Sequence, residues 1–250
     1  MRMIMRFKSI KYLLTALLAL GAATASAGGF DWSAGVGYNI GATTPLGLPA
    51  SIRSIGGYSP GANISAGVNA TYMLAHGFGI GLGVSADNLN MNAEITTRNY
   101  HLTMDIVDGD ETGTRTGYYT GKIHNKTRLT YLTVPLYAVY RPDSKWEVDL
   151  GPYVAFALHR SFKGEVSEGR MREDPYHPVI SITKAEYDYS SDLRNVDAGI
   201  MAAASRKVWR GLAVKASMRW GLMSVMNPST RKIDINTYNV YLNIGASYSF

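Results

Sequence analysis

The sequence contains no cysteine among its 250 residues. This absence excludes a disulfide scaffold, a thiolate metal site, a cysteine nucleophile and a lipid-modified N-terminal cysteine. Charged residues make up only 18% of the chain and hydrophobic residues 46%, a balance that excludes a disordered protein. Apolar runs are also short, because none reaches the roughly 18 residues of a membrane-spanning helix. The chain therefore has to bury its apolar residues without crosslinks and without a transmembrane helix.

The first 27 residues have the features of a secretory signal peptide. An apolar run over 13–23 precedes the small residues Ala25-Ser26-Ala27, and the basic residues before the run are Arg2, Arg6, Lys8 and Lys11. We therefore expect a signal peptide over residues 1–27 and one domain over residues 28–250. Loss of the four leader cations lowers the formal net charge from +6 to +2. A secreted domain that is nearly neutral is not expected to bind nucleic acid.

Beyond the leader, apolar residues alternate with small or polar residues in eight segments. The segment 78–87 is typical, since Ile80, Leu82 and Val84 alternate with glycine and serine. Such a period of two predicts strands with one apolar face. The eight segments are 30–41, 63–74, 78–87, 132–140, 146–159, 195–204, 212–222 and 238–250.

The connections between these segments alternate in length. Short turns follow the second, fourth and sixth segments, whereas long polar segments cover about 43–61, 90–128, 162–193 and 224–237. An even number of strands with short turns on one side and long loops on the other is typical of outer-membrane barrels. We therefore predict an all-β fold, an eight-stranded antiparallel up-and-down transmembrane β-barrel.

A soluble β-sandwich or lipocalin-like barrel is the alternative interpretation, because its strands alternate in the same way. The second face of each predicted strand is rich in glycine, serine, asparagine and charge, which suits a lumen better than an outer surface. Aromatic residues lie near the strand ends, as in the interfacial girdles of membrane barrels. These features and the leader favour the cell outer membrane as the location after signal-peptide cleavage.

Two prolines, Pro135 and Pro152, lie within predicted strands. Proline lacks the N–H group of a ladder hydrogen bond, and a closed barrel has no edge strand to accommodate it. We therefore expect a β-bulge at each proline.

Five charged residues fall on the polar face of three consecutive predicted strands. We expect them to form a charge network in the lumen, in which acids and bases pair across the strands: Glu147, Asp149, Asp197, Lys215 and Arg219. Such a network could form an ion path. Eight strands enclose just enough room for side chains, however, which favours a structural network.

No constellation of catalytic or metal-binding residues is evident. The five histidines lie on different segments (His76, His101, His124, His159 and His177), and none has the spacing of a metal ligand pair. We therefore expect no enzyme, no cofactor and no metal site.

Four short motifs in the second half of the chain carry a family resemblance. They are YLTVPL at 131–136, LGPY at 150–153, DAG at 197–199 and RWGL at 219–222. Their order and spacing over residues 128–250 resemble the PorT-like outer-membrane β-barrel family of Bacteroidetes. The resemblance implies a small barrel in contact with outer-membrane lipid, and its name-giving protein is associated with secretion of surface proteins.

The C-terminal residues Tyr248 and Phe250 are similar to the assembly signal that the outer-membrane barrel assembly machinery reads. We therefore expect a non-enzymatic envelope protein with a structural or secretion-accessory role, whose partners include this machinery and secretion-system components. Two alternatives remain open from the residues. One is a narrow transporter or channel with a charged lumen, and the other is a surface-binding protein that acts through its long extracellular loops.

Overall fold

The computed structural model describes residues 29–45, 50–108, 111–227 and 236–250. These residues form one antiparallel sheet and a single short 3-10 helix, η1 (Ser190–Asp192), and none of them forms a helix that could cross a membrane. The expected signal peptide lies outside the described residues. The ten strands are β1 (Phe30–Pro45), β2 (Ile52–Pro60), β3 (Ile64–Met73), β4 (Phe78–Asp108), β5 (Glu111–Tyr140), β6 (Trp146–Arg172), β7 (Ile180–Asp188), β8 (Val196–Trp209), β9 (Leu212–Gly221) and β10 (Thr237–Ser249).

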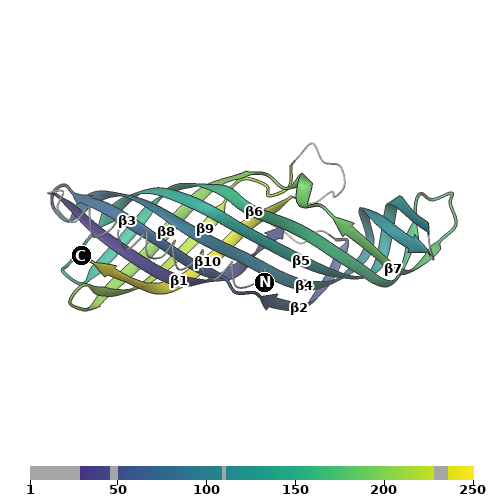
Figure 1. The fold of residues 1–250 in the computed structure, drawn as a ribbon, viewed down its shortest axis with the longest axis horizontal. Helices are drawn as coiled ribbons and strands as arrows, with labels where there is room; N and C mark the ends of the chain where they lie inside the picture. The colour runs from purple at the N-terminus through teal and green to yellow at the C-terminus, as the bar shows by residue number, and fades with distance from the viewer. Residues whose placement is uncertain (1–28, 46–49, 109–110, 228–235) are drawn as a thin grey trace, which may run out of the picture.

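Eight of the strands are joined edge to edge in a closed circuit, which we call the ring. They pair in the order β1, β3, β4, β5, β6, β8, β9 and β10, and β10 pairs again with β1. The ring forms one end of an elongated molecule (Figure 1). The predicted all-β antiparallel fold is confirmed, but the described residues form ten strands instead of eight, because β2 and β7 lie outside the ring.

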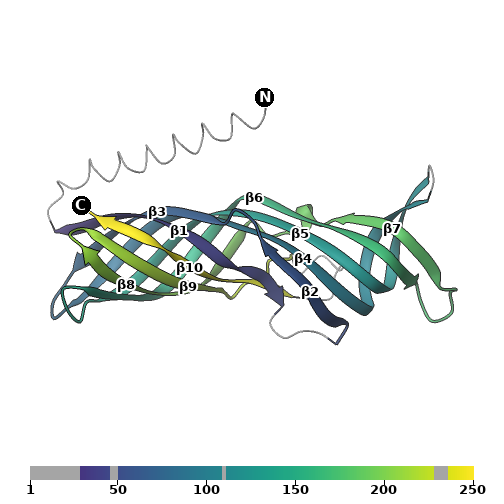
Figure 2. The same ribbon diagram turned by 90° about the horizontal axis from the view of Figure 1, so that it is seen from below.

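Three strands continue far beyond the ring. β4, β5 and β6 have 31, 30 and 27 residues, and they run to the opposite end of the molecule (Figures 1 and 2). β2 joins β4 just beyond the ring, near the middle of the molecule, and β7 lies farther out. We call this part the extension. Its strands form a second circuit, since β4 pairs with β5, β5 with β6, β6 with β7, and β7 with β4. The exposed edge of β4 is covered in turn by β3, β2 and β7, so that few edge groups of β4 remain unpaired.

The extension corrects the prediction of long loops. The segment 90–128 is a strand hairpin of β4 and β5, and the segments 43–61 and 162–193 contain β2 and β7. Alternation continues through these segments, but the outward residues become polar, as with Asn88, Asn90 and Asn92 after Val84. Polar outward residues and many threonines are also typical of loops, and for this reason the sequence predicted loops in these segments.

The polarity of the two faces reverses where β4 leaves the ring. Within the ring, Ile80 and Leu82 point outward and are about half exposed, while Asp87 points inward and is fully buried. In the extension the inward positions are held by Leu89 and Met91, which are buried. The ring is therefore polar inside and apolar outside, and the extension has the opposite arrangement.

The bulges expected at Pro135 and Pro152 are absent, so that prediction is wrong. The pairing of β5 with β6 and of β6 with β8 keeps one register through both prolines. A missing N–H leaves one ladder position without a hydrogen bond, and this requires no inserted residue. Register shifts lie elsewhere in the described strands, for example between Thr130 and Tyr131.

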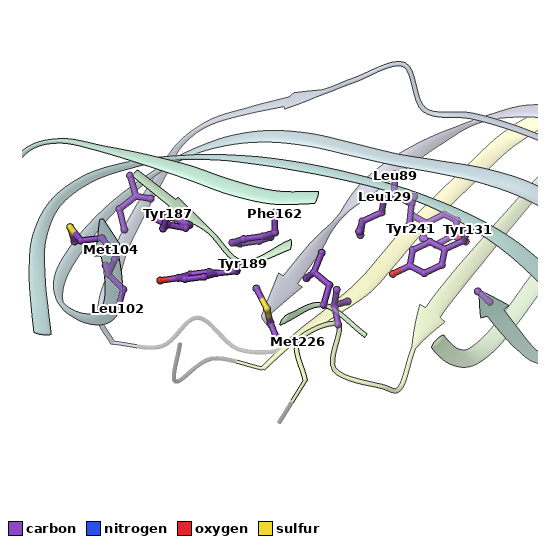
Figure 3. Packing of buried hydrophobic residues seen from close by; sticks show 14 of the residues in the cluster. Leu89, Leu102, Met104, Leu129, Tyr131, Phe162, Tyr187, Tyr189, Met226 and Tyr241 are labelled. Carbon is purple, nitrogen blue, oxygen red and sulfur yellow. The ribbon is translucent and has the colours of Figure 1, made fainter. Parts of the chain in front are cut away.

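An aromatic stack forms the centre of the extension (Figure 3). The ring centroids of Tyr187 and Tyr189 are 4.7 Å apart, and Phe162 stacks on Tyr189 at 6.2 Å. The Tyr187 hydroxyl donates to the Asn125 side-chain oxygen. A side chain at Gly164 would overlap the Tyr187 ring, so glycine is required there. The extension thus has an apolar core, which continues through Leu129 and Tyr131 toward the ring.

Candidate functional site

The most deeply buried ion pair of the ring joins Arg219 on β9 to Asp87 on β4. The Arg219 Nη1 to Asp87 Oδ2 distance is 2.5 Å, and the two residues are 7% and 0% exposed. Ser65 and Ser85 donate to the two carboxylate oxygens at 2.6 and 2.8 Å. Arg219 also donates to the Tyr241 hydroxyl at 3.0 Å. Hydrogen bonds to both partners offset much of the cost of removing two charges from water.

A second pair lies nearer the rim of the ring at which β1 begins and β10 ends, which we call the chain-end rim. Lys215 Nζ on β9 is 2.8 Å from Asp149 Oδ2 on β6, and its ammonium lies 5.8 Å from the centre of the Tyr137 ring. The Tyr137 ring lies over Gly81 of the neighbouring strand β4, where any side chain would overlap it, and its hydroxyl donates to Asn69 Oδ1 on β3 at 3.3 Å. The charged, small and aromatic side chains therefore fill the lumen together.

Glu147 belongs to a third group at the same end. Arg141 Nε donates to Glu147 Oε2 at 2.8 Å, and Arg141 Nη1 donates to Asp31 Oδ2 at 2.6 Å. Arg141 follows β5 and Asp31 begins β1, so this group connects two distant strands of the ring.

Asp197 has a different environment from the other acids. Its Oδ2 accepts hydrogen bonds from Asn239 Nδ2 at 3.0 Å and from the Tyr153 hydroxyl at 3.3 Å. Asn239 Nδ2 also donates to the Tyr131 hydroxyl at 3.2 Å. Among the described residues, no lysine or arginine forms an ion pair with Asp197. This carboxyl is held by neutral donors.

The five predicted lumen residues all point into the ring, but only one of the expected pairs forms among them. Asp149 pairs with Lys215, whereas Glu147 pairs with Arg141, and Arg219 pairs with Asp87 instead of Asp197. The sequence prediction missed Asp87, although its position in the alternation after Ser85 already placed it on the inward face.

Two cavities lie along the lumen. A small cavity of about 70 Å³ adjoins Arg219, Ser65 and Ser217, and a larger one of about 340 Å³ at the chain-end side is lined by Asp31, Arg141 and other polar residues. Because Asp87 and Arg219 are closed to solvent, side chains fill the ring at their level.

The C-terminal aromatic residues lie on the outside of the ring. Tyr248 and Phe250 are about half exposed, and their ring centroids are 5.7 Å apart in an edge-on arrangement. The end of β10 therefore exposes two apolar aromatic side chains on the outer surface of the ring.

Metal-binding side chains do not gather in the described part of the chain. No group of three or more histidine, aspartate or glutamate side chains lies close enough there to hold a metal ion. The charged groups of the ring are instead used in pairs and in hydrogen bonds.

Comparison with known proteins gives one family match and several solved structures of low similarity. The sequence model of a family described as outer membrane protein beta-barrel domain matches residues 22–227. The solved structure of Ail, the attachment invasion locus protein of Yersinia pestis, is similar at 10% identity, covering 88% of this chain and 97% of that one, with a TM-score of 0.36. Neisserial surface protein A is similar at 11% identity, covering 89% and 97%, with a TM-score of 0.31. No protein with a curated description matches the sequence.

Proposed function

The chain belongs to the outer membrane protein β-barrel family, and we propose that its ring crosses the outer membrane as a closed, non-enzymatic barrel that carries the extension as a binding platform outside the cell. The protein is located in the outer membrane. In this proposal residues 1–27 are removed as a signal peptide, and residues 28–250 form the barrel domain.

The outer surface of the ring supports the membrane-crossing role. Large apolar side chains cover it, and aromatic pairs line its chain-end rim, with ring centroids 5.2 Å apart for Phe30 and Tyr72 and 4.7 Å apart for Phe78 and Tyr140. Lipid favours apolar side chains and water favours polar ones, so the reversal of polarity after Asp87 supports a membrane boundary at the junction with the extension. Every backbone group in hydrocarbon needs a partner, which a closed circuit of strands provides.

The filled lumen is the observation that favours a structural role over the channel alternative. The buried Arg219–Asp87 pair joins two strands that are not neighbours and therefore occupies the interior where an ion would have to pass. Recording in planar lipid bilayers tests this: the purified protein should give no reproducible conductance steps. Regular conductance steps that change when Arg219 is replaced would refute the closed barrel.

The residues that carry the PorT-like resemblance favour a structural reading of the motifs. Tyr131, Tyr153 and Asp197 come from three different motifs and meet inside the ring. Asn239 donates to Tyr131 and to Asp197, and Tyr153 donates to Asp197. The motifs therefore support a shared barrel interior. A secretion-accessory role is the second candidate, and it rests on the resemblance alone. Deletion of the protein should change the set of secreted proteins if that role holds, and should leave the set unchanged if the role is purely structural.

Assembly of the barrel is the proposed role of the C-terminal residues. Tyr248 and Phe250 are accessible at a strand end, as a signal for the assembly machinery requires. Replacing Phe250 with Ser should reduce the amount of folded protein in the outer membrane while leaving the amount synthesised unchanged. Normal amounts of folded protein would argue against the signal.

A further inference from the structure

A surface cleft lies on the extension, on the outward side of β5 and β6. Its volume is about 510 Å³, which is within the range of small-ligand sites. Two cross-strand pairs form its floor: Tyr118 faces Arg172, and Thr120 faces Arg170. Asn99 on β4 and Val179 before β7 border it.

Beside the cleft, the strands β4 and β5 depart from regular pairing. Register shifts occur between Thr97 and Tyr100 on β4 and between Thr120 and Lys122 on β5, at adjacent points. Asn99, with a φ of 52°, adopts the left-handed conformation that few non-glycine residues adopt. Its N–H donates to the Thr120 hydroxyl oxygen at 3.0 Å. Bulges and strained residues of this kind often reorient side chains at binding sites.

The cleft carries two arginines that have no acidic partner in the described part of the chain. Arg170 and Arg172 are exposed, and neither forms an ion pair there. They point to the same side of β6, about 6–7 Å apart by the strand repeat. Unpaired guanidinium groups in a cleft favour a ligand with carboxylate or other planar anionic groups, which they bind in a bidentate manner.

One acid, Asp174, also lines the cleft, but its oxygens are already used. It accepts hydrogen bonds from the N–H groups of Tyr176 and His177 at 2.7 and 3.0 Å, and it pairs with His177 Nδ1 at 2.8 Å. These bonds hold the loop after β6 and lower the pKa of the Asp174 carboxyl, with the His177 hydrogen bond as the largest cause. Asp174 therefore shapes the rim, and the two arginines supply an excess of positive charge.

The aromatic floor specifies the ligand further. Tyr118 is 47% exposed, its ring meets His101 edge-on at 5.4 Å, and it is the cross-strand neighbour of Arg172. An exposed tyrosine ring offers an apolar face and a polar tip, and a sugar ring can stack its C–H face on such a surface. An extended peptide would need a free strand edge for main-chain hydrogen bonds. β5 and β6 pair with each other through the cleft, so that edge is not available.

We propose that this cleft binds an acidic saccharide, whose sugar ring stacks on Tyr118 and whose carboxylate binds Arg172 and Arg170. The Asn99 side-chain amide donates to a sugar hydroxyl at the rim, because the Thr120 hydroxyl is already bonded to the N–H and the Oδ1 of Asn99. The inference rests on the proposed binding platform and names its ligand class. It gives the extension a ligand-binding role, for which the filled lumen of the ring has no room.

The test is isothermal titration calorimetry on the full-length protein in detergent micelles, with tetragalacturonic acid as the probe. Its methyl ester is the matched ligand without charge, and tetraglutamate is the matched acid without sugar. The acid should bind, and the ester and tetraglutamate should bind at least tenfold more weakly. Arg172→Gln should weaken binding of the acid roughly ten- to hundredfold, as loss of a charge-assisted hydrogen bond predicts.

The variants separate the parts of the site. Tyr118→Ala should weaken binding of both the acid and the ester, whereas Lys184→Gln, an exposed cation on β7 outside the cleft, should change neither. Each variant is first shown to be folded by its heat-dependent mobility in detergent gels. Absence of binding, equal binding of the ester or of tetraglutamate, or unchanged binding by Arg172→Gln would each overturn the proposal. Such a result would leave the outward position of the extension standing, since that is measured separately by labelling of intact cells.

Discussion

Removal of one partner of the Arg219–Asp87 pair should destabilise the ring strongly. Arg219→Met keeps the length of the side chain but leaves the Asp87 carboxylate buried without a cation, beside neutral donors such as Ser65 and Ser85. Breaking a buried pair in this way costs about 3–5 kcal/mol of unfolding free energy. Asp87→Asn leaves the guanidinium unpaired instead, and we expect a loss of similar size.

The double variant Asp87→Asn/Arg219→Met should lose clearly less than the two single variants combined, because no charge is left unpaired. We expect a coupling of about 2–3 kcal/mol, at the upper end for directly contacting residues. The pair Asp197→Asn and Arg219→Met should couple more weakly, because Asp197 bonds to Asn239 and Tyr153 instead of to Arg219.

Urea unfolding in lipid vesicles, followed by tryptophan fluorescence, measures these free energies. Arg115→Gln is the control, since its pair with Glu173 lies at the surface, with side chains 54% and 27% exposed, and should contribute only about 0–1 kcal/mol. Additive losses for Asp87 and Arg219 would show that the two residues do not stabilise the ring as a pair, and would refute the reasoning.

Three further predictions concern other parts of the chain. Gly164→Val should displace the aromatic side chain of Tyr187 and make the extension sensitive to protease, while the eight-stranded ring stays resistant. An unchanged digestion pattern would count against a packed core in the extension. The hydrogen bond that the His177 side chain donates to Asp174 raises the pKa of His177, so their ion pair is formed below that raised pKa and is lost as the pH rises through it. Asp174→Asn should lower the pKa of His177 toward its usual value in an NMR titration, and an unaltered titration would contradict the contact. Mass spectrometry of protein from the outer membrane should find the chain beginning after Ala27, and an intact leader would disprove the cleavage.

The sequence predicted which face of each ring strand points inward. The period of two predicts that Asp149, Asp197 and Arg219 point inward, and all three are buried in the structure. The same period did not identify the partner of Arg219. Asp87 and Arg219 lie on strands that are not neighbours, and which residues meet across a lumen depends on the tilt and stagger of all the strands.

The extension could not be predicted because its alternation has the opposite polarity. Outside lipid, a strand turns polar residues outward and apolar residues inward. In the extension the polar Asn90 therefore points outward and the apolar Leu89 inward, whereas in the ring the apolar Val84 points outward and the polar Ser85 inward. A bulge at Leu158 adds to the difficulty. It moves the inward face of β6 from odd positions, such as Ala155, to even ones, such as Phe162.

The most direct test of the account is labelling of single cysteines on intact cells with a membrane-impermeant maleimide. The chain has no cysteine of its own, so each introduced thiol reports one position. Tyr176→Cys probes the extension, where Tyr176 is 96% exposed, and Ser144→Cys probes the turn at the chain-end rim of the ring. The account predicts that Tyr176→Cys is labelled on intact cells and that Ser144→Cys is labelled only after the outer membrane is permeabilised. Labelling of Ser144→Cys on intact cells, with Tyr176→Cys protected, would contradict it.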